Sequence, residues 1–331
     1  MNVTEEIALV GSQSPLRSVE RDEHLLLSPA LPPGKVRMRP PREHPPLSVV
    51  HFPQEYRELP FARPRDVYEN DEIRVEWQTM NSRQPFYHRN CDVDEISYQI
   101  AGERTLMTEL GVIEHRPGEF SLIPRGVAHD NDGRRESHLL FYLPAPVAEL
   151  VPAQRESAPV FPPFPGWQPG GINEAVTQCM GSPGHDITVF GVDEQLLLDQ
   201  VHAEQRRINV LRADPGSAVT MLYGTELIRL ILVATTPGGP RRYRRLLDAD
   251  EIQYQVSGRR TLVTQRGIVE LGPGDFVRVP LGVSQADATI EPGRYIRLLS
   301  HRELPQVAET TRVAEAYSPE LLETLNAEVH S

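Results

Sequence analysis

An internal duplication is the feature that most constrains the fold of this chain. Residues 92–131, DVDEISYQIAGERTLMTELGVIEHRPGEFSLIPRGVAHDN, recur as residues 248–287, DADEIQYQVSGRRTLVTQRGIVELGPGDFVRVPLGVSQAD. The offset is 156 residues throughout, without a gap, so that Glu95 corresponds to Glu251 and Gly102 to Gly258. Solenoid repeats have periods of roughly 20–50 residues, so a period this long indicates a duplicated domain. The sequence therefore predicts two domains of the same fold.

Each copy shows the pattern of short β-strands. EISYQIAG alternates apolar and polar residues, PGEFSLIPRG is a short strand between Pro/Gly turns, and SHLLFYLP at 137–144 adds another strand. A sheet of many short strands must protect its edges, and closing into a barrel or sandwich does this. The predicted fold class is therefore all-β, with an antiparallel barrel in each copy.

Composition changes along the chain predict five segments. Near the end, Ser318 fits an N-cap and Pro319 the first position of a helix. Residues 193–208 fit either a short helix or a strand. The predicted segments are an extended N-terminal arm rich in Pro and Arg (1–47), an N-terminal barrel (48–150), a Pro-rich linker and connecting segment (151–204), a C-terminal barrel (205–300) and a tail with a short helix (301–331).

Charge and composition exclude several classes of partner. The formal net charge is -12 and no block of basic residues offsets it, which disfavours nucleic acid and anionic lipid as partners. The first residues are acidic, unlike a secretory leader, and no apolar stretch approaches the length of a membrane span. Cys91 and Cys179 are too few for a disulfide framework. We expect a cytoplasmic protein.

The alternation of side chains groups polar residues that could bind a metal ion. Residues two apart on a strand share a face, which gives the sets Phe86, His88, Asn90; Glu95, Ser97, Gln99; and Val127, His129, Asn131. If these faces turn inward, His88, Glu95 and His129 can converge on one metal ion. Two imidazoles and one carboxylate on one side of a metal leave the other side open, which suits non-heme Fe(II).

The same residues carry a family resemblance. HRNCDVDEISYQIAG resembles the first cupin motif, and GEFSLIPRGVAHDN resembles the second. The spacings agree, with seven residues from His88 to Glu95, seven from Glu95 to Gly102 and eleven from Gly118 to His129. The resemblance covers residues 68–143, with a degenerate echo at 223–299. It implies a bicupin of two tandem double-stranded β-helix (jelly-roll) barrels, and bicupins are often homodimers.

One group of bicupins is closer in its metal-binding string. YHRNC at residues 87–91 is similar to the corresponding string of homogentisate dioxygenases, in which His, Glu and His hold iron for ring cleavage. Asn90 in this string stands where most cupins have a second His, which narrows the resemblance to this group. Two departures from the group leave the substrate open. The carboxylate comes one residue later than in that family, and Arg125 stands where that family has its last His.

The second copy lacks the two candidate imidazoles. An offset of 156 residues places Arg244 at the position of His88 and Gln285 at that of His129. A guanidinium is permanently protonated and cannot bind a cation. We therefore predict that the C-terminal barrel is free of metal and has a structural or dimer-forming role.

These observations lead to a functional hypothesis. The resemblance implies an Fe(II)-dependent dioxygenase that cleaves a small hydroxylated aromatic of the homogentisate, gentisate, hydroquinone or catechol type. His88, Glu95 and His129 would hold the iron. Candidate substrate-binding residues are Phe86, Asn90, Ser97, Gln99 and Asn131.

Other hypotheses remain open from the sequence. His138 and Tyr142 share a strand face and could donate protons, although packing is the favoured role for both. The chain could instead be a cupin isomerase, lyase or hydrolase that uses Mn, Ni or Zn without oxygen chemistry. A third hypothesis is a ligand-binding or structural bicupin without catalysis.

Overall fold

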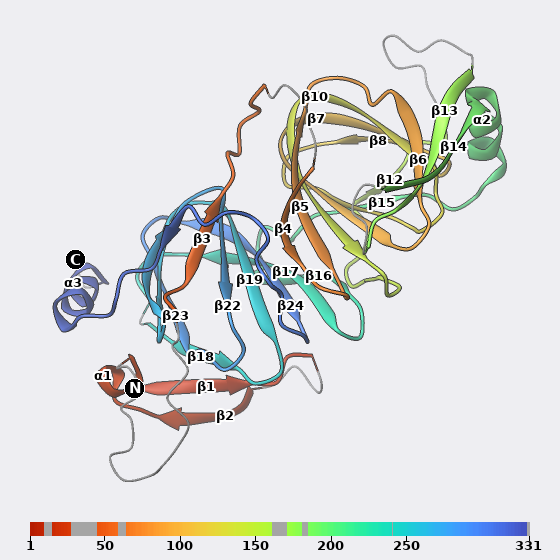
Figure 1. The fold of residues 1–331 in the computed structure, drawn as a ribbon. Helices are drawn as coiled ribbons and strands as arrows, with labels where there is room; N and C mark the ends of the chain where they lie inside the picture. Colours follow the sequence, from red (N-terminus) through yellow and green to blue (C-terminus); the bar gives the residue numbers. More distant parts are fainter. Residues whose placement is uncertain are drawn as a thin grey trace.

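The computed structural model describes residues 1–9, 15–27, 45–58, 64–160, 171–180, 185–239 and 241–329. Its regular structure is almost entirely β-strand, arranged as two barrels in tandem (Figure 1). The predicted all-β class is therefore confirmed.

The N-terminal barrel consists of two sheet layers joined by its two longest strands, β7 (Asp94–Thr108) and β10 (His129–Leu143). The first half of β7 pairs with the second half of β10 in one layer, and the remaining halves pair in the other. The layer that faces the other barrel, here called the contact layer, also contains β4 (Arg65–Glu69), β5 (Arg74–Met80), β9 (Phe120–Ile123), β12 (Arg155–Glu156) and β15 (Asn209–Leu211). The outer layer adds β6 (Phe86–Asn90), β8 (Gly111–His115), β13 (Gly171–Gln178) and β14 (His185–Asp193).

The C-terminal barrel repeats this arrangement. Its contact layer contains β3 (Ser48–His51), β11 (Ala148–Glu149), β16 (Val219–Gly224), β17 (Ile228–Thr235), β19 (Asp250–Ser257), β22 (Asp275–Val279), β24 (Gly293–Ser300) and β25 (Arg312–Val313). Its outer layer contains β1 (Asn2–Glu6), β2 (Pro15–Glu20), β18 (Tyr243–Leu246), β20 (Arg260–Thr264), β21 (Gly267–Leu271) and β23 (Gln285–Thr289).

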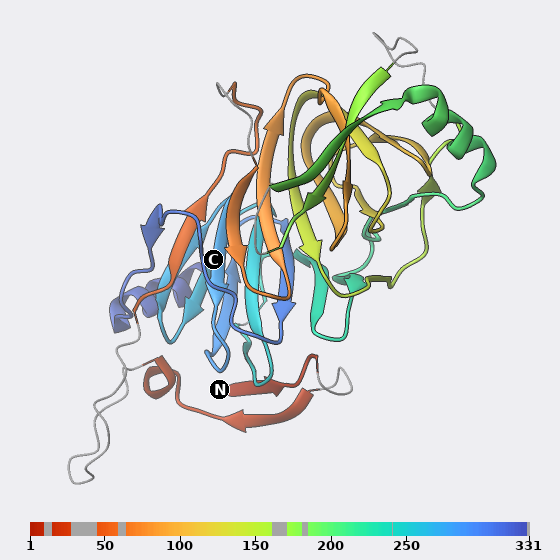
Figure 2. The same ribbon diagram turned by 45° about the vertical axis from the view of Figure 1, so that its right-hand side comes forward.

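Each barrel is completed by strands from the other half of the chain. In the C-terminal barrel, β1 pairs in parallel with β18, and β3 pairs with β22. In the N-terminal barrel, β13 pairs in parallel with β6, and β15 pairs with β9. The orange-red strand β3 accordingly lies among blue strands in Figure 1, and the red hairpin β1–β2 lies beside the same barrel in Figure 2.

This exchange changes the expected segment boundaries. Residues 2–6 and 15–27, expected in an extended arm, form a hairpin and a helix on the C-terminal barrel, and β3 joins that barrel rather than the N-terminal one. The segment 151–204, expected as a linker, contributes β12, β13, β14 and a helix to the N-terminal barrel. Residues 28–44 and 161–170 lie outside the described part of the chain.

Two helices occupy matching positions on the two outer layers. Helix α2 (Glu194–Ala203) packs Leu197 and Val201 against Tyr87 and Met107. Helix α1 (Glu23–Leu27) packs Leu26 and Leu27 against Tyr243 and Val263, which follow Tyr87 and Met107 by 156 residues. Residues 194–203, which the sequence left open between helix and strand, are therefore helical.

The C-terminal helix α3 (Pro319–Val329) has the predicted start. The backbone N–H of Leu321 donates to Ser318 Oγ at 3.2 Å, which is the N-cap hydrogen bond. Leu322 and Leu325 pack with the residues of α1 on the C-terminal barrel. Among the described residues no helix is long and apolar enough to cross a membrane.

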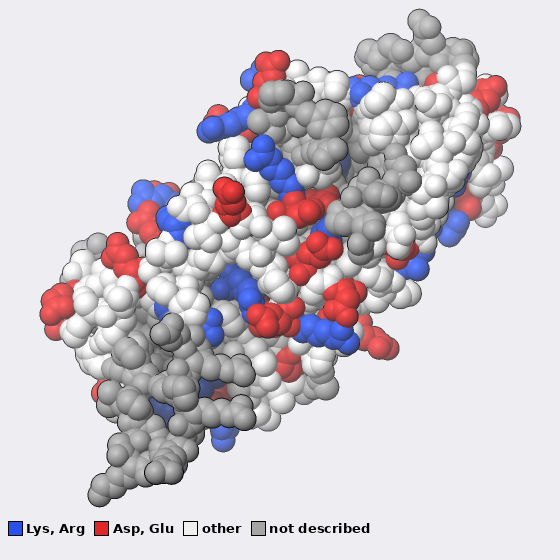
Figure 3. Space-filling model, viewed as in Figure 1, with Lys and Arg blue, Asp and Glu red and all other residues white. Residues whose placement is uncertain are grey.

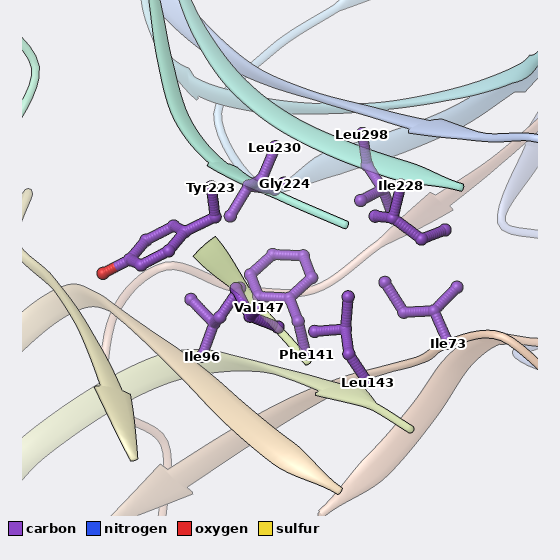
Figure 4. Close-up of a pocket in the computed structure, with 10 residues that line it drawn as sticks. All are labelled: Ile73, Ile96, Phe141, Leu143, Val147, Tyr223, Gly224, Ile228, Leu230 and Leu298. Carbon is purple, nitrogen blue, oxygen red and sulfur yellow. The ribbon is translucent and has the colours of Figure 1, made fainter. Parts of the chain in front are cut away.

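The contact layers bury the largest hydrophobic cluster between the barrels. Ile96 and Tyr98 of β7 point into this cluster and meet apolar residues of the other barrel, including Tyr223 and Ile252. A small cavity of about 10 Å³ lies at this junction. Figure 4 shows Phe141 and Leu143 on one side of it and Leu230 and Leu298 on the other. Because Ile96 and Tyr98 of β7 face the cluster, the residues that alternate with them, Glu95, Ser97 and Gln99, face the barrel interior.

On the outside of the molecule, acidic and basic side chains are interspersed across the middle of the face shown in Figure 3.

We predict that Gly102→Ala destabilises the protein by more than the about 1–2 kcal/mol that a left-handed backbone conformation costs a non-glycine residue. Gly102 has φ +69°, and a Cβ atom there would lie 2.2 Å from the Arg135 carbonyl oxygen. Gly126 also has positive φ, +80°, but its Cβ would meet nothing within 4 Å. Gly126→Ala is therefore the matched control, and equal losses in urea unfolding would contradict the predicted clash.

Candidate metal centre

Three strands bring the predicted ligands together. His88 on β6 lies opposite His129 on β10 in the strand register, and Glu95 on β7 approaches from the contact layer. One ligand atom from each of the three lies within 4.8 Å of the others. The imidazole centroids are 3.9 Å apart, and His129 Nε2 is 3.4 Å from Glu95 Oε2. His88, Glu95 and His129 thus form a compact cluster in the N-terminal barrel.

The hydrogen bonding of His129 leaves a free nitrogen aimed at this cluster. Nδ1 lies 3.0 Å from the Val127 carbonyl oxygen, which can only accept, so Nδ1 carries a proton. Nε2 has no hydrogen-bond partner although the side chain is fully buried. A buried nitrogen lone pair facing a carboxylate oxygen is unfavourable unless a proton or a cation lies between them. The three residues therefore fit a metal ion in both geometry and donor type.

Electrostatics favours the ligand forms of His88 and Glu95. Burial, together with the charge of His129, lowers the pKa of His88 to about 3, so that its imidazole is neutral near pH 7. Burial alone would raise the pKa of Glu95, but His129, His88 and Asn90 outweigh it and lower that pKa to about 2. Burial also lowers the pKa of His129, but the neighbouring Glu95 carboxylate outweighs it and the net shift is upward. A cation at this place would replace the proton that the His129–Glu95 pair otherwise shares.

Asn90 fixes the carboxylate of the cluster. Its side-chain amide donates to Glu95 Oε2 at 2.8 Å. Its Oδ1 accepts from Thr177 Oγ1 at 3.0 Å and from Cys179 Sγ at 3.2 Å. Because two donors hold Oδ1, the amide nitrogen must face Glu95. Asn90 therefore contacts Glu95 directly, and its contact with a substrate stays a prediction.

The structure also adds residues that sequence reasoning missed. Thr177 lies in β13 and Cys179 directly follows it, and β13 belongs to the other half of the chain, so the sequence carried no signal for them. Gln84 Nε2 lies 3.3 Å from His88 Nδ1. Its position could have been found, because residues 84, 86 and 88 share parity just as Phe86 and His88 do.

The remaining predicted substrate residues lie at two levels of the barrel. Near the cluster, the Phe86 ring lies 6.3 Å from that of His88, and Asn131 donates to Gln84 Oε1 at 3.5 Å while its own Oδ1 has no partner. Farther along the same face of β7 as Glu95, Ser97 accepts from Arg104, and Gln99 donates to Glu136 Oε2 at 3.1 Å. The structure thus keeps Phe86 and Asn131 near the cluster, whereas Ser97 and Gln99 bond within the protein.

The two candidate proton donors also differ in position. His138 Nε2 lies 3.1 Å from Gln78 Oε1, and Nδ1 lies 3.5 Å from Glu136 Oε2, away from the cluster. Tyr142 lies opposite Glu95 in the strand register, with the Arg74 guanidinium 4.9 Å from its ring centroid. Burial, and then the charge of Glu76, raise the pKa of Tyr142. A proton-donor role for either residue stays a prediction.

The C-terminal barrel has an internal cation at the corresponding place. Arg244 lies opposite Gln285 in the register, as His88 lies opposite His129. The Arg244 guanidinium donates to both oxygens of Glu251 at 2.6 Å. Gln285 and Gln253 donate to the same carboxylate at 3.1 and 2.7 Å. Burial opposes these contacts, yet the charge of Arg244 keeps the pKa of Glu251 well below its usual range.

Comparisons with known proteins find likeness of fold only. No protein-family model matches the sequence, and neither does any curated protein. Among solved structures, a cupin 2 conserved barrel domain protein from Leptotrichia buccalis aligns over 74% of this chain and 91% of its own, at 8% identity and a TM-score of 0.47. Two variants of Bacillus subtilis oxalate decarboxylase each align at 14% identity. The first alignment covers 81% of this chain and 80% of the decarboxylase, with a TM-score of 0.47. The second covers 80% of this chain and 81% of the decarboxylase, with a TM-score of 0.48.

The strand pairing itself establishes the all-β architecture of two tandem barrels, which is the architecture that the cupin-like motifs of the sequence imply. Similarity at such low identity and TM-score carries no argument about chemistry. The chemistry has to be argued from the cluster of His88, Glu95 and His129.

We predict that the protein binds one divalent metal ion per chain. His129→Ala removes the free nitrogen and should reduce the metal content to near zero, whereas His202→Ala, at an exposed histidine of α2, should leave it unchanged. Metal analysis after gel filtration measures this. Two ions per chain, or an unchanged content in His129→Ala, would show that the assignment is wrong.

A second prediction concerns Asn90. Asn90→Ala frees the Glu95 carboxylate and should weaken metal binding about 10–100-fold, the usual loss when a residue that orients a ligand is removed. Cys179→Ser replaces the thiol with a hydroxyl, which can also donate to Asn90 Oδ1. Because Asn90 then keeps both of its donors, the metal affinity should change by less than about twofold. Competition with a chelating dye gives both affinities. Equal affinities for Asn90→Ala and the parent would exclude this positioning role.

Proposed function

We propose that this chain is a metal-dependent oxidoreductase, an Fe(II) dioxygenase that opens the ring of a small hydroxylated aromatic. The observation that carries the proposal is the unpartnered Nε2 of buried His129, which faces Glu95 and His88. Two neutral imidazoles and a single carboxylate form the donor set that leaves neighbouring coordination positions open in non-heme iron oxygenases. When bound, Fe(II) would supply the electron transfer through which dioxygen reacts with an electron-rich ring.

The residues of the chain would hold and orient the substrate. His88 is the ligand with the greatest exposure, so a substrate would approach from the side of β6. Phe86 lies at that side and offers a ring for an edge or stacking contact. The free Oδ1 of Asn131 is an acceptor for a substrate hydroxyl.

A redox-neutral metal enzyme is the second candidate. The same donor set also binds Zn, and neither Mn nor Ni is excluded by two imidazoles and a carboxylate. Such an isomerase, lyase or hydrolase would need the metal only as a Lewis acid. A non-catalytic bicupin would need no metal at all.

Oxygen consumption distinguishes these functions. The Fe(II)-loaded protein, prepared without oxygen, is mixed with aromatic diols and hydroxybenzoates in an oxygen-electrode cell. We expect one dioxygen to be consumed for each ring opened. The rate should be at least about 100-fold lower for His129→Ala than for His202→Ala, because the loss of a metal ligand removes the metal site itself.

The other outcomes favour the other candidates. Bound metal without oxygen uptake for any aromatic would favour the redox-neutral enzyme. A protein that retains no metal after loading would favour the non-catalytic bicupin. An equal rate for His129→Ala and the parent would contradict the proposed function.

A further inference from the structure

Two carboxyl groups, buried Glu76 and partly exposed Asp66, lie beside the candidate metal centre and are not among its candidate ligands. Glu76 on β5 pairs in register with Asp66 on β4 and with Leu140 on β10. Leu140 shares the interior face of β10 with Tyr142, which is opposite Glu95. Glu76 therefore faces the barrel interior, in the row of side chains next to the one that contains Glu95.

The two carboxyl groups differ in their access to solvent. The side chain of Glu76 is 3% exposed, whereas that of Asp66 is 31% exposed. Arg74 lies between them, with NH2 2.7 Å from Glu76 Oε1 and Nε 3.8 Å from Asp66 Oδ1. Glu76 Oε2 has no donor. The pair thus extends from the surface to the interior of the barrel.

The C-terminal barrel shows that the fold does not require these acids. In the matching register, Met221 pairs with Ile231, and Ile231 pairs with Arg297 of β24. Met221 and Ile231 stand where the N-terminal barrel has Asp66 and Glu76, and they pack in an apolar cluster with Leu299. Burying a carboxyl group is unfavourable, so its presence in only the barrel with the candidate metal centre indicates a role in that centre.

We propose that Asp66 and Glu76 form a proton relay between the candidate metal centre and solvent. This proposal rests on the proposed function, because the relay serves a substrate hydroxyl that must lose its proton. The hydroxyl gives that proton to Glu76 while the proton already on Glu76 passes to the Asp66 carboxylate, and Asp66 releases it to water. One proton leaves the site, and no electron is transferred.

The surrounding charges are consistent with a protonated Glu76. Burial raises the pKa of Glu76 to about 8, with Arg74 opposing the shift and Asp66 and Glu95 adding to it. The phenol of Tyr142, whose pKa is raised by burial and by Glu76, also stays protonated. Glu76 therefore carries its proton at neutral pH, while its neighbours Asp66 and Arg74 provide an acceptor and a fixed cation.

Infrared spectroscopy of the metal-loaded parent protein tests the relay without substrate. We expect a protonated-carboxyl C=O band at neutral pH that disappears as the pH is raised, because burial raises the pKa of Glu76. The band should be absent in Glu76→Gln, and its midpoint should move to lower pH in Asp66→Asn. Asp71→Asn, at an exposed carboxylate paired with Arg302, is the matched control and should leave the band unchanged.

Oxygen uptake provides the second readout. Glu76→Gln and Glu76→Ile should keep the metal content of the parent and lose at least about tenfold in rate, within the usual contribution of proton transfer. The Ile variant carries the residue of the other barrel, so it separates a proton role from packing. A band that persists in Glu76→Gln, or a parental rate in either variant, overturns the relay and leaves the metal site intact. A parent protein that binds no metal overturns the proposed function as well.

Discussion

A buried carboxylate at the same place in each barrel needs a positive charge, and this need governs the interior of both. In the C-terminal barrel the charge is built in, since the Arg244 guanidinium bridges both oxygens of Glu251. In the N-terminal barrel Glu95 faces two imidazoles, one of which has an unpartnered nitrogen. An unpaired buried charge is strongly destabilising, so a proton or a metal ion has to complete the N-terminal site. The duplication thus produced one barrel with a resident cation and one that can take up a cation.

The exchange of strands between the halves ties this site to the whole molecule. Asn90, which holds Glu95, is itself held by Thr177 and Cys179 from the segment that forms the end of β13 and continues past it. That segment belongs to the second half of the chain, just as β1 and β3 of the first half complete the C-terminal barrel. Neither barrel is complete without the other half, and the shared hydrophobic cluster fixes their contact layers together. We infer that the geometry of the candidate metal centre depends on both halves folding.

The sequence predicted the ligand cluster because two local rules sufficed. Strand alternation placed His88, Glu95 and His129 on inward faces, and the constant offset placed Arg244 opposite Gln285. The exchanged strands could not be predicted, because their pairs join residues far apart in the sequence, such as Val3 with Tyr243 and Phe86 with Asn173, and leave no local pattern. Asp66 and Glu76 lie outside the repeated motifs, and only the register shows that they meet.

The most direct test of the account is the position of a bound metal in a crystal of the protein grown with Fe(II) or Mn(II). Anomalous scattering is predicted to give one peak per chain, between His129 Nε2, Glu95 and His88. A peak beside Glu251, or three side chains that turn away from one another with no peak between them, would contradict it.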